Sequence, residues 1–428
     1  MSTHEPAARI DGATGAATNV DARPPVVPWL YAAALVATLA LSRHYIADAY
    51  FYSSRVSAAV PLWAPLAAIP VVVALAFLLH SLVARAGASA LNGLDLAMLV
   101  WVGAAAASAL AVDEPAPFFA GDLFTYFAAA LAFLVARALA PDGERLGRAL
   151  AIAAALVAVT VLLDAEGLWP SHGVRRPGGL LHNRNYAAEY LALALPFACA
   201  IAHERKWLAV AVLLSFALGL TRCRTAWLAA AAGVAALALL SWRARRRLRY
   251  AIAAPLVGAI LALLVPTRLH WESSSLETAS HLVALHEGSG LVRWRQLVET
   301  VRLVVDRPTG LGPGRWREEM RGIDPTLAVN INPHSDYVRA LATGGVPCLA
   351  GLLLVFGMAA FAAWRSRGEP ARLAFVVAAA VVSAGDAMLY RLETLTATMF
   401  VLGMLAAGAR PVERAESVDG RLQDALVE

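Results

Sequence analysis

The amino-acid sequence predicts an all-α, polytopic membrane protein with about 12 transmembrane helices. Composition is the first reason: of the 428 residues, 59% are hydrophobic and only 16% are charged, and the mean hydropathy is +0.61. A soluble globular domain is nearer to half apolar and a quarter charged. The second reason is that apolar runs long enough to cross the hydrocarbon as a helix recur along the whole chain.

These apolar runs together predict one transmembrane domain at 26–410. The candidate spans, in chain order, are 26–42, 59–84, 91–112, 117–138, 149–166, 185–202, 207–221, 225–242, 250–266, 343–364, 371–387 and 394–409. The stretch 1–25 lacks the basic start, apolar middle and cleavage site of a signal peptide, so we expect a disordered cytoplasmic tail. We expect 411–428 to be a second cytoplasmic tail.

Arginines in short loops predict the side of the membrane that each loop faces, because such loops are retained in the cytoplasm. The strongest anchor is SWRARRRLR, which follows the eighth span. It places both termini in the cytoplasm and the long loop at 267–335, which we expect to contain short helices, outside. Arg222 and Arg224 contradict the rule, since they stand in a tight turn on the outer side. They indicate either an anionic ligand at the outer surface or side chains that snorkel to the interface.

Two outer segments begin helices with polar side chains that suit an anion. In RRPGGLLHNRNYAAEYLALALP, Asn185 is expected to cap a helix, and Arg184 is placed to meet an anion at the same N-terminus. In LTRCRTAWLAA, Arg222 and Arg224 offer planar guanidinium groups that fit phosphate oxygens in pairs. The alternative is structural in both segments: a helix cap in the first and snorkelling arginines in the second.

The segment SGLVRWRQLVETVRLVVDRPTGLGPG predicts an amphipathic helix that ends at Pro308 and the glycines after it. Such a helix lies on the membrane surface or caps the bundle. Arg293 and Leu297 are four residues apart and therefore share a face. We interpret GLGPG as a turn, because no GxxxxGK[ST] phosphate loop is present. The expected apolar stripe consists of Val292, Leu297, Val301, Val304 and Val305.

The segment NPHSDYVRALATGG leads into the tenth span and carries polar side chains that are energetically costly to place in a membrane. We expect Asn332 and Pro333 to start a helix, which puts His334 in its first turn. A neutral histidine at a membrane surface suits general-base work on a hydroxyl. A histidine that only makes a hydrogen bond at a helix start is the alternative, and the residues alone leave both open.

Several absences narrow the function. The net charge of +5 is spread over short loops without a contiguous basic region, which argues against a nucleic-acid partner. The three cysteines are isolated, and no HExxH, GxSxG or Walker loop is present. Asp164 and Glu166 form a DxE at the outer end of the fifth span and could hold a metal ion, but carboxylates are common at the ends of spans. We therefore expect no metal and no cofactor.

Together, four of these segments resemble the O-antigen ligase and polymerase superfamily of bacterial envelope glycosyltransferases. NRNYAAEYLALALP is similar to an asparagine-led helix start, and TRCRTAWLA to a T-x-S-R-G-A turn, with Cys223 and Thr225 departing from it. RWRQL fits the ligase RxxxL pattern and is followed by DRPTGLGPG, close to D-x-P-L-x-G-x-G. The interval from His334 to Gly345 fits HxxxxxxxxxxG, with Ser335 where asparagine is common.

The resemblance implies a metal-independent, inverting glycosyl transfer from a polyprenyl pyrophosphate carrier to a sugar hydroxyl. It assigns Arg224 and Arg293 to the pyrophosphate and His334 to the acceptor hydroxyl. The expected substrate-binding residues beside these catalytic ones are Arg184, Asn185, Arg222 and Arg339. The implied setting is a bacterial inner membrane, crossed several times, with the active site on the periplasmic face.

The leading hypothesis is an O-antigen ligase, which moves glycan onto lipid A-core in lipopolysaccharide biosynthesis. Within the superfamily, the alternatives are an O-antigen or exopolysaccharide polymerase and a protein O-oligosaccharyltransferase. A non-enzymatic membrane transporter is an alternative of a different class. The charge-poor interiors of the spans disfavour it, since transporters tend to place ionisable groups mid-span.

Overall fold

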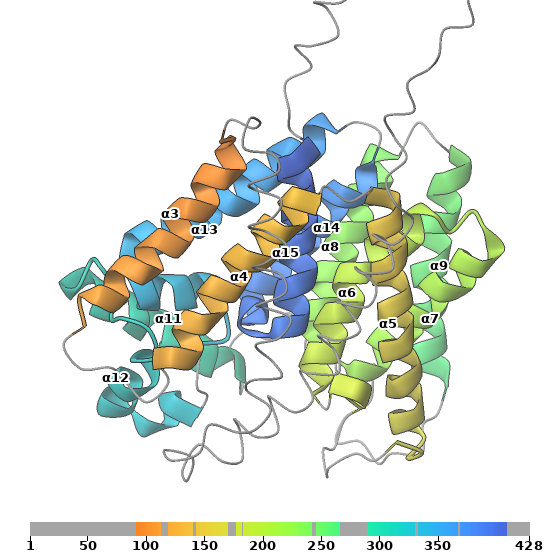
Figure 1. Ribbon diagram of the computed structural model, residues 1–428. Coiled ribbons are helices and arrows are strands. Elements are labelled where there is room, and N and C mark those ends of the chain that lie inside the picture. Colours follow the sequence, from red (N-terminus) through yellow and green to blue (C-terminus); the bar gives the residue numbers. More distant parts are fainter. Residues whose placement is uncertain are drawn as a thin grey trace, which may run out of the picture.

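The computed structural model describes residues 91–112, 119–139, 143–169, 177–181, 183–241, 245–265, 289–329, 333–366 and 369–408. Within these ranges the chain forms 12 α-helices, three short 3-10 helices and no strand, which confirms the all-α class (Figure 1). The candidate spans at 26–42 and 59–84 and both predicted tails lie outside the described residues.

Each of the other ten candidate spans falls on a helix. These helices are α3 (Gly93–Leu110), α4 (Phe119–Leu139), α5 (Gly143–Ala165), α6 (Arg184–Ala200), α7 (Arg205–Thr221), α8 (Arg224–Leu240), α9 (Arg245–Leu264), α13 (Asp336–Arg365), α14 (Pro370–Gly385) and α15 (Leu392–Gly408). By length and composition, α3, α5 and α13 can cross a membrane. The helices α8, α14 and α15 are shorter but apolar, so the number of spans stays a prediction.

The helices alternate in direction, and side-chain contacts identify the two ends of the bundle. At one end, the Asn92 side chain at the start of α3 donates to the Ala406 carbonyl near the end of α15. There Arg137 near the end of α4 also pairs with Asp95 at 2.7 Å. At the other end, Asp122 near the start of α4 pairs with Arg339 near the start of α13. We call this second end the site end, because the residues discussed below lie there.

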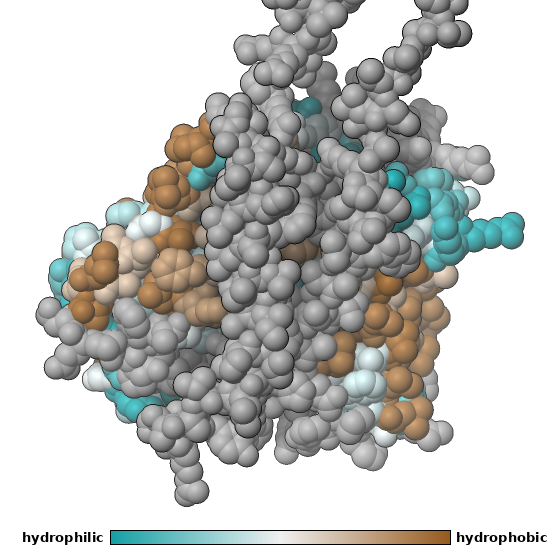
Figure 2. All heavy atoms as spheres, viewed as in Figure 1, coloured by the Kyte–Doolittle hydropathy of each residue, from teal (hydrophilic) through white to brown (hydrophobic). Residues whose placement is uncertain are grey.

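Apolar side chains both fill the bundle and cover its flanks. The central helix is α6, in which every residue from Tyr186 to Cys199 is buried, as expected for a helix that is apolar nearly all round. Large apolar side chains such as Leu99 on α3 and Leu256 on α9 are exposed. Figure 2 shows hydrophobic surface along α3 and on the flank near α7 and α9. This outward apolar surface is typical of a protein embedded in lipid.

The long loop contains short helices where the structure describes it, from residue 289 onwards. They are α11 (Ser289–Asp306), α12 (Trp316–Ile323) and the 3-10 helix η3 (Pro325–Val329). A second, smaller core holds them together, and its buried members are Leu311, Trp316, Met320, Leu327, Ala328 and Ala342. The predicted loop residues 267–288 lie outside the described ranges.

The apolar stripe predicted for α11 is partly wrong. Val304 is buried, but Val301 and Val305 are 42% and 73% exposed. The buried face carries Gln296 and Thr300 instead. These two polar side chains tolerate burial because Gln296 donates to the Leu327 carbonyl at 2.8 Å and Thr300 to the Gln296 carbonyl at 2.7 Å.

Two helix starts also differ from the prediction. The cap of α6 is Asn183, whose side chain accepts from the Asn185 N–H at 2.9 Å, so Asn185 is the second residue of the helix and not its cap. The cap of α13 is Ser335, whose hydroxyl accepts from the Val338 N–H. His334 therefore precedes the helix and does not lie in its first turn. In both cases a side-chain oxygen two or three residues from the predicted cap meets the free N–H groups better.

The helix α13 is broken at Gly344 and Gly345, and the loop after α11 fills the break. Gly345 has φ 65° and ψ −156°, a conformation that is essentially restricted to glycine. Because Pro347 has no N–H, the Thr343 carbonyl loses its helical donor. The Gly312 N–H at 3.1 Å and the Ser108 hydroxyl at 2.6 Å supply replacements.

Two further hydrogen bonds complete this junction between the loop and α13. The Val346 N–H donates to the Pro308 carbonyl at 3.1 Å, and the Leu311 N–H donates to the Ala342 carbonyl at 2.7 Å. Val346 and Ala342 would bond to each other in an unbroken helix. The break is therefore an exchange of helical bonds for loop bonds, and it fixes the loop against α13.

We predict that Gly345→Ala destabilises the protein by roughly 2–5 kcal/mol, since it adds backbone strain and a steric clash. The new Cβ would overlap the Pro308 carbonyl oxygen and lie 2.6 Å from the Gly310 nitrogen. Gly357→Ala, in the same helix, is the control, because within the described residues no atom beyond the adjoining turns of the helix lies within 4 Å of its Cβ position. Size-exclusion chromatography after heating the detergent-extracted protein measures the difference. Equal melting of the two variants would contradict the prediction.

Candidate active site

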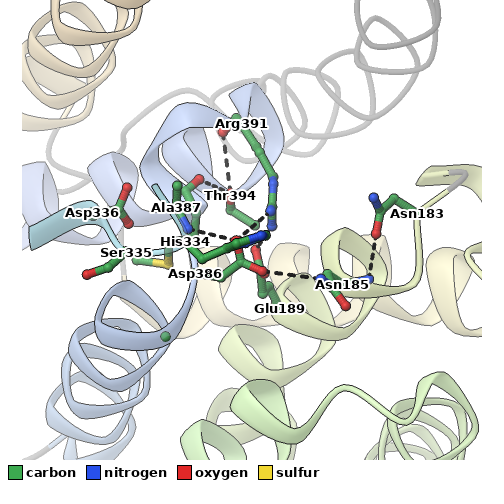
Figure 3. Close-up of polar contacts among 12 residues, drawn as sticks. Asn183, Asn185, Glu189, His334, Ser335, Asp336, Asp386, Ala387, Arg391 and Thr394 are labelled. Carbon is green, nitrogen blue, oxygen red and sulfur yellow. Dashed lines mark hydrogen bonds and ion pairs between the residues drawn. The ribbon is translucent and has the colours of Figure 1, made fainter. Parts of the chain in front are cut away.

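Several of the predicted site residues lie around the end of α14, where Asp386 follows Gly385. The Asp386 carboxylate receives side chains from three other segments (Figure 3). His334 Nδ1 lies 3.5 Å from its Oδ1, the Arg391 Nη2 donates to Oδ1 at 2.9 Å, and the Asn185 amide donates to Oδ2 at 3.3 Å. The start of α6, the approach to α13 and the start of α15 thus meet at one carboxylate.

His334 is held at the edge of this cluster by the residues that follow it. The Ser335 hydroxyl donates to the Ser383 carbonyl at 3.1 Å, and the Tyr337 hydroxyl donates to the Ala380 carbonyl at 3.1 Å. These bonds fasten the start of α13 to α14. The imidazole remains 26% exposed, whereas Asp386 is 2% exposed. When Nδ1 carries its proton toward Asp386, Nε2 is the ring nitrogen left to accept one.

Asp386 lies beyond the last residue of α14, and its surroundings shift the pKa of its buried carboxyl in two opposing ways. Burial raises its pKa, but the charge of Arg391 lowers it, with help from the hydrogen bond to His334 and the charge of Arg293. The lowering effects win, and they hold the pKa of Asp386 well below its usual range. Its own neighbour contributes as well, because the Ala387 N–H donates to Oδ1 at 2.8 Å.

Arg391 completes a buried ionic cluster that the sequence analysis did not identify. Its guanidinium also donates to Glu189, which is fully buried on α6, and its Cζ lies 3.6 Å from the centre of the Tyr186 ring. The sequence carried a signal for this cluster. In GDAMLYRLE, Asp386, Arg391 and Glu393 stand between two apolar runs, where charges are expected to be functional or paired.

The structure brings Arg293 to the same place. Its Nη1 donates to the Gly385 carbonyl at 2.8 Å, so α11 reaches across to the end of α14. Gly385 has another close neighbour, since a Cβ on this glycine would lie 2.8 Å from the Thr225 hydroxyl oxygen. Arg224, the residue before Thr225 and the first of α8, therefore stands next to the cluster.

Arg184 and Arg222 occupy positions at helix ends. Arg184 is the first residue of α6, directly before Asn185, which donates to Asp386. Arg222 follows the last residue of α7 and has the left-handed conformation, with φ 55° and ψ 32°. An arginine seldom adopts this conformation, and the tight turn to α8 imposes it. Both arginines thus lie at the site end of the bundle.

Arg339 differs from the other predicted residues, because groups inside the bundle surround its guanidinium. Its Nε donates to Asp122 at 2.8 Å, and its Cζ lies 4.9 Å and 4.8 Å from the ring centres of Tyr126 and Tyr390. The side chain is 4% exposed. Asp122 also accepts from the Gly314 N–H at 3.0 Å. These contacts favour a structural role for Arg339, which joins α13 to α4 and the long loop.

The described residues contain no group of three or more histidines, cysteines or acidic side chains arranged to hold a metal ion. The carboxylates raised in the sequence analysis have other contacts where the structure shows them. Asp164 accepts from the Gly178 and Gly179 N–H groups at 2.8 Å and 2.9 Å, which fastens the turn before α6 to the end of α5.

Comparison with known families adds an independent finding. Residues 209–353 match the family described as O-antigen ligase. The match covers about a third of the chain and runs from α7 to the middle of α13, so it includes Arg224, Arg293, His334 and Gly345. Comparison with curated proteins finds none that matches this chain. The family match and the arrangement of these residues together support the assignment of this chain to the O-antigen ligase superfamily.

Proposed function

We propose that this protein is an O-antigen ligase. It moves a glycan from a polyprenyl pyrophosphate carrier to a sugar hydroxyl of lipid A-core, on the periplasmic face of a bacterial inner membrane. The observation that carries the proposal is the partly exposed His334 ring, which lies 3.5 Å from the buried Asp386 carboxylate. The residue before Asp386, Gly385, accepts from Arg293 and lies against Thr225, which follows Arg224. A base and fixed positive charges at one end of a membrane bundle suit this transfer.

In the proposed reaction, His334 acts on the acceptor. The acceptor hydroxyl oxygen attacks the anomeric carbon of the first sugar, and the bond from that carbon to the pyrophosphate oxygen breaks. Nε2 of His334 takes the hydroxyl proton while Asp386 faces Nδ1 and orients the ring. The 3.5 Å separation of His334 and Asp386 is long, as is common before a substrate tightens such contacts. Attack opposite the leaving group inverts the anomeric centre.

The arginines take the place that a metal ion holds in other pyrophosphate reactions. Positive charge fixed where the leaving group develops negative charge lowers the barrier. Within the described part of the chain, Arg184 Nη1 and Arg293 Nε are buried without a hydrogen-bond acceptor. Buried donors of this kind call for an explanation, and a phosphate oxygen would satisfy them. Arg184 also stands at the N-terminus of α6, where the helix dipole favours an anion.

The gel pattern of lipopolysaccharide tests the assignment to a ligase. We expect deletion of this gene in its host to remove O-antigen from lipid A-core, while long polymer accumulates on the polyprenyl carrier. Lipid A-core that bears a single repeat would instead indicate a polymerase. Unchanged lipopolysaccharide would contradict both, and would favour exopolysaccharide synthesis, protein O-glycosylation or transport.

We predict that His334→Ala lowers glycan transfer by about 10²–10⁴-fold, the usual contribution of a general base. Because the His334 ring is partly exposed and Arg391 still pairs with Asp386 after its loss, the amount and melting temperature of the protein should hold. His203→Ala is the matched control, since His203 is an exposed histidine in the turn between α6 and α7. Transfer by purified protein in liposomes measures the effect. Normal activity of His334→Ala would remove the catalytic assignment.

We predict that Arg293→Ala lowers transfer by about 10²–10³-fold, because it removes a fixed charge from the leaving group. Arg295 provides the control on the same helix: it pairs with Asp324 at 2.9 Å and is half exposed. Arg295→Ala should keep most activity. An equal loss in both variants would show that the helix, and not the charge of Arg293, matters.

A double-mutant cycle separates the proposed orienting role of Asp386 from its structural role. Asp386→Asn removes the charge that pairs with Arg391, so we expect lower thermal stability as well as lower transfer. If Asp386 acts on the reaction through His334, adding Asp386→Asn to His334→Ala costs no further activity per folded molecule. Independent, multiplying losses would contradict the orienting role.

A further inference from the structure

The helix α11 has an apolar stripe on the side that faces away from the bundle. At 100° per residue, its members fall within one narrow sector of the helix. The four exposed members are Leu291, Trp294, Val301 and Val305, and their exposed fractions lie between 42% and 73%. We call these four residues the α11 stripe.

The face of α11 opposite the stripe is packed against the rest of the protein. Gln296, Thr300 and Val304 are buried against the rest of the loop and the bundle, and Arg293 reaches the Gly385 carbonyl. The packing of α11 on the protein therefore leaves the stripe unexplained. In water, a tryptophan and three aliphatic side chains on one stripe would be costly to leave exposed.

Charge borders the stripe along one side. Arg295 and Arg302 project next to it, and their side chains are 51% and 71% exposed. Each is also bonded to an acidic neighbour, Asp324 and Glu299. An exposed tryptophan flanked by long basic side chains is typical of helices that lie in the interfacial layer of a membrane.

The level of α11 along the bundle is consistent with this layer. After its break, α13 continues over residues 346–365, and a helix of about 20 residues spans roughly 30 Å, the thickness of the hydrocarbon core. The loop that follows α11 is bonded to α13 at its break, near Val346. From there onwards α13 carries exposed apolar side chains, namely Val346, Leu353 and Leu354. The outward apolar surface of α13 thus begins where α11 ends.

We propose that the α11 stripe is embedded in the interfacial layer of the leaflet at the site end of the bundle. Lipid glycerol and acyl groups cover Trp294 and Val305, and lipid phosphates lie near Arg295 and Arg302. A second copy of the chain is the weaker candidate for the occupant. Four side chains on one helix fall well short of the roughly 1,200 Å² that stable protein interfaces bury.

Spin labels on single cysteines in the full chain test this proposal. The labelled variants are Trp294→Cys and Val305→Cys on the stripe, with Arg302→Cys as the control on the same helix. The native cysteines are buried, and the unsubstituted protein gives their background labelling. Each variant is reconstituted in vesicles of phosphatidylethanolamine and phosphatidylglycerol. Collision rates with oxygen, which partitions into lipid, and with a water-soluble nickel chelate are then compared.

The expected result is a loss of nickel accessibility at positions 294 and 305, with oxygen accessibility kept, while position 302 stays accessible to nickel. High nickel accessibility at all three positions would overturn the proposal, since the stripe would then face water. Low accessibility to both reagents at 294 and 305 would also overturn it. That outcome would show that protein, either another segment of this chain or a second copy, covers the stripe.

Discussion

The structure at the site end depends on a buried group of ionisable side chains that have to be paired. Asp386 and Glu189 share the single guanidinium of Arg391, and all three side chains are nearly or fully buried. Burying ionisable side chains without a partner is costly, so each of the three depends on the others for its place. Because they come from α6, the end of α14 and the start of α15, these segments are obliged to meet. His334 is attached to this group by its contact with Asp386.

Polar contacts can set positions inside a membrane protein more sharply than apolar packing, because lipid tails are as apolar as the helix surfaces. The segment between α14 and α15 illustrates this. Tyr390 lies against Arg339, which is paired with Asp122, and the Leu389 N–H donates to Asp336 at 3.1 Å. Arg391 follows directly and is bonded to Glu189. Two ionic groups thus hold one short segment from both sides, and the orientation of Asp386 toward His334 is a consequence of that hold.

Much of the fold was predictable from the sequence, because apolar runs of sufficient length record where helices form. Each predicted span in the described ranges lies on a helix. The sequence also indicated His334, Arg224 and Arg293, since polar side chains at the ends of apolar runs need a reason to be there. It did not reveal the pairing of Arg391 with Glu189, about 200 positions apart, because partners in three dimensions leave no spacing pattern. The buried face of α11 was missed for a related reason: Gln296 and Thr300 are buried beside partners that lie further along the loop, since Gln296 donates to the Leu327 carbonyl and the Trp316 indole donates to Thr300.

The spacing between Arg293 and the glycines after α11 is a geometrical requirement. Arg293 contacts Gly385 at one end of α11, and the turn at Gly310 is fixed against the break in α13 at the other. Each residue added to or removed from the helix between them would rotate Arg293 by about 100°. Its guanidinium would then leave the Gly385 carbonyl, and one of the two changes would turn it toward the side that carries the α11 stripe. The loop, the break and Arg293 therefore work as one unit, which places a positive charge at Gly385, next to Asp386, from a helix that also faces lipid in our proposal.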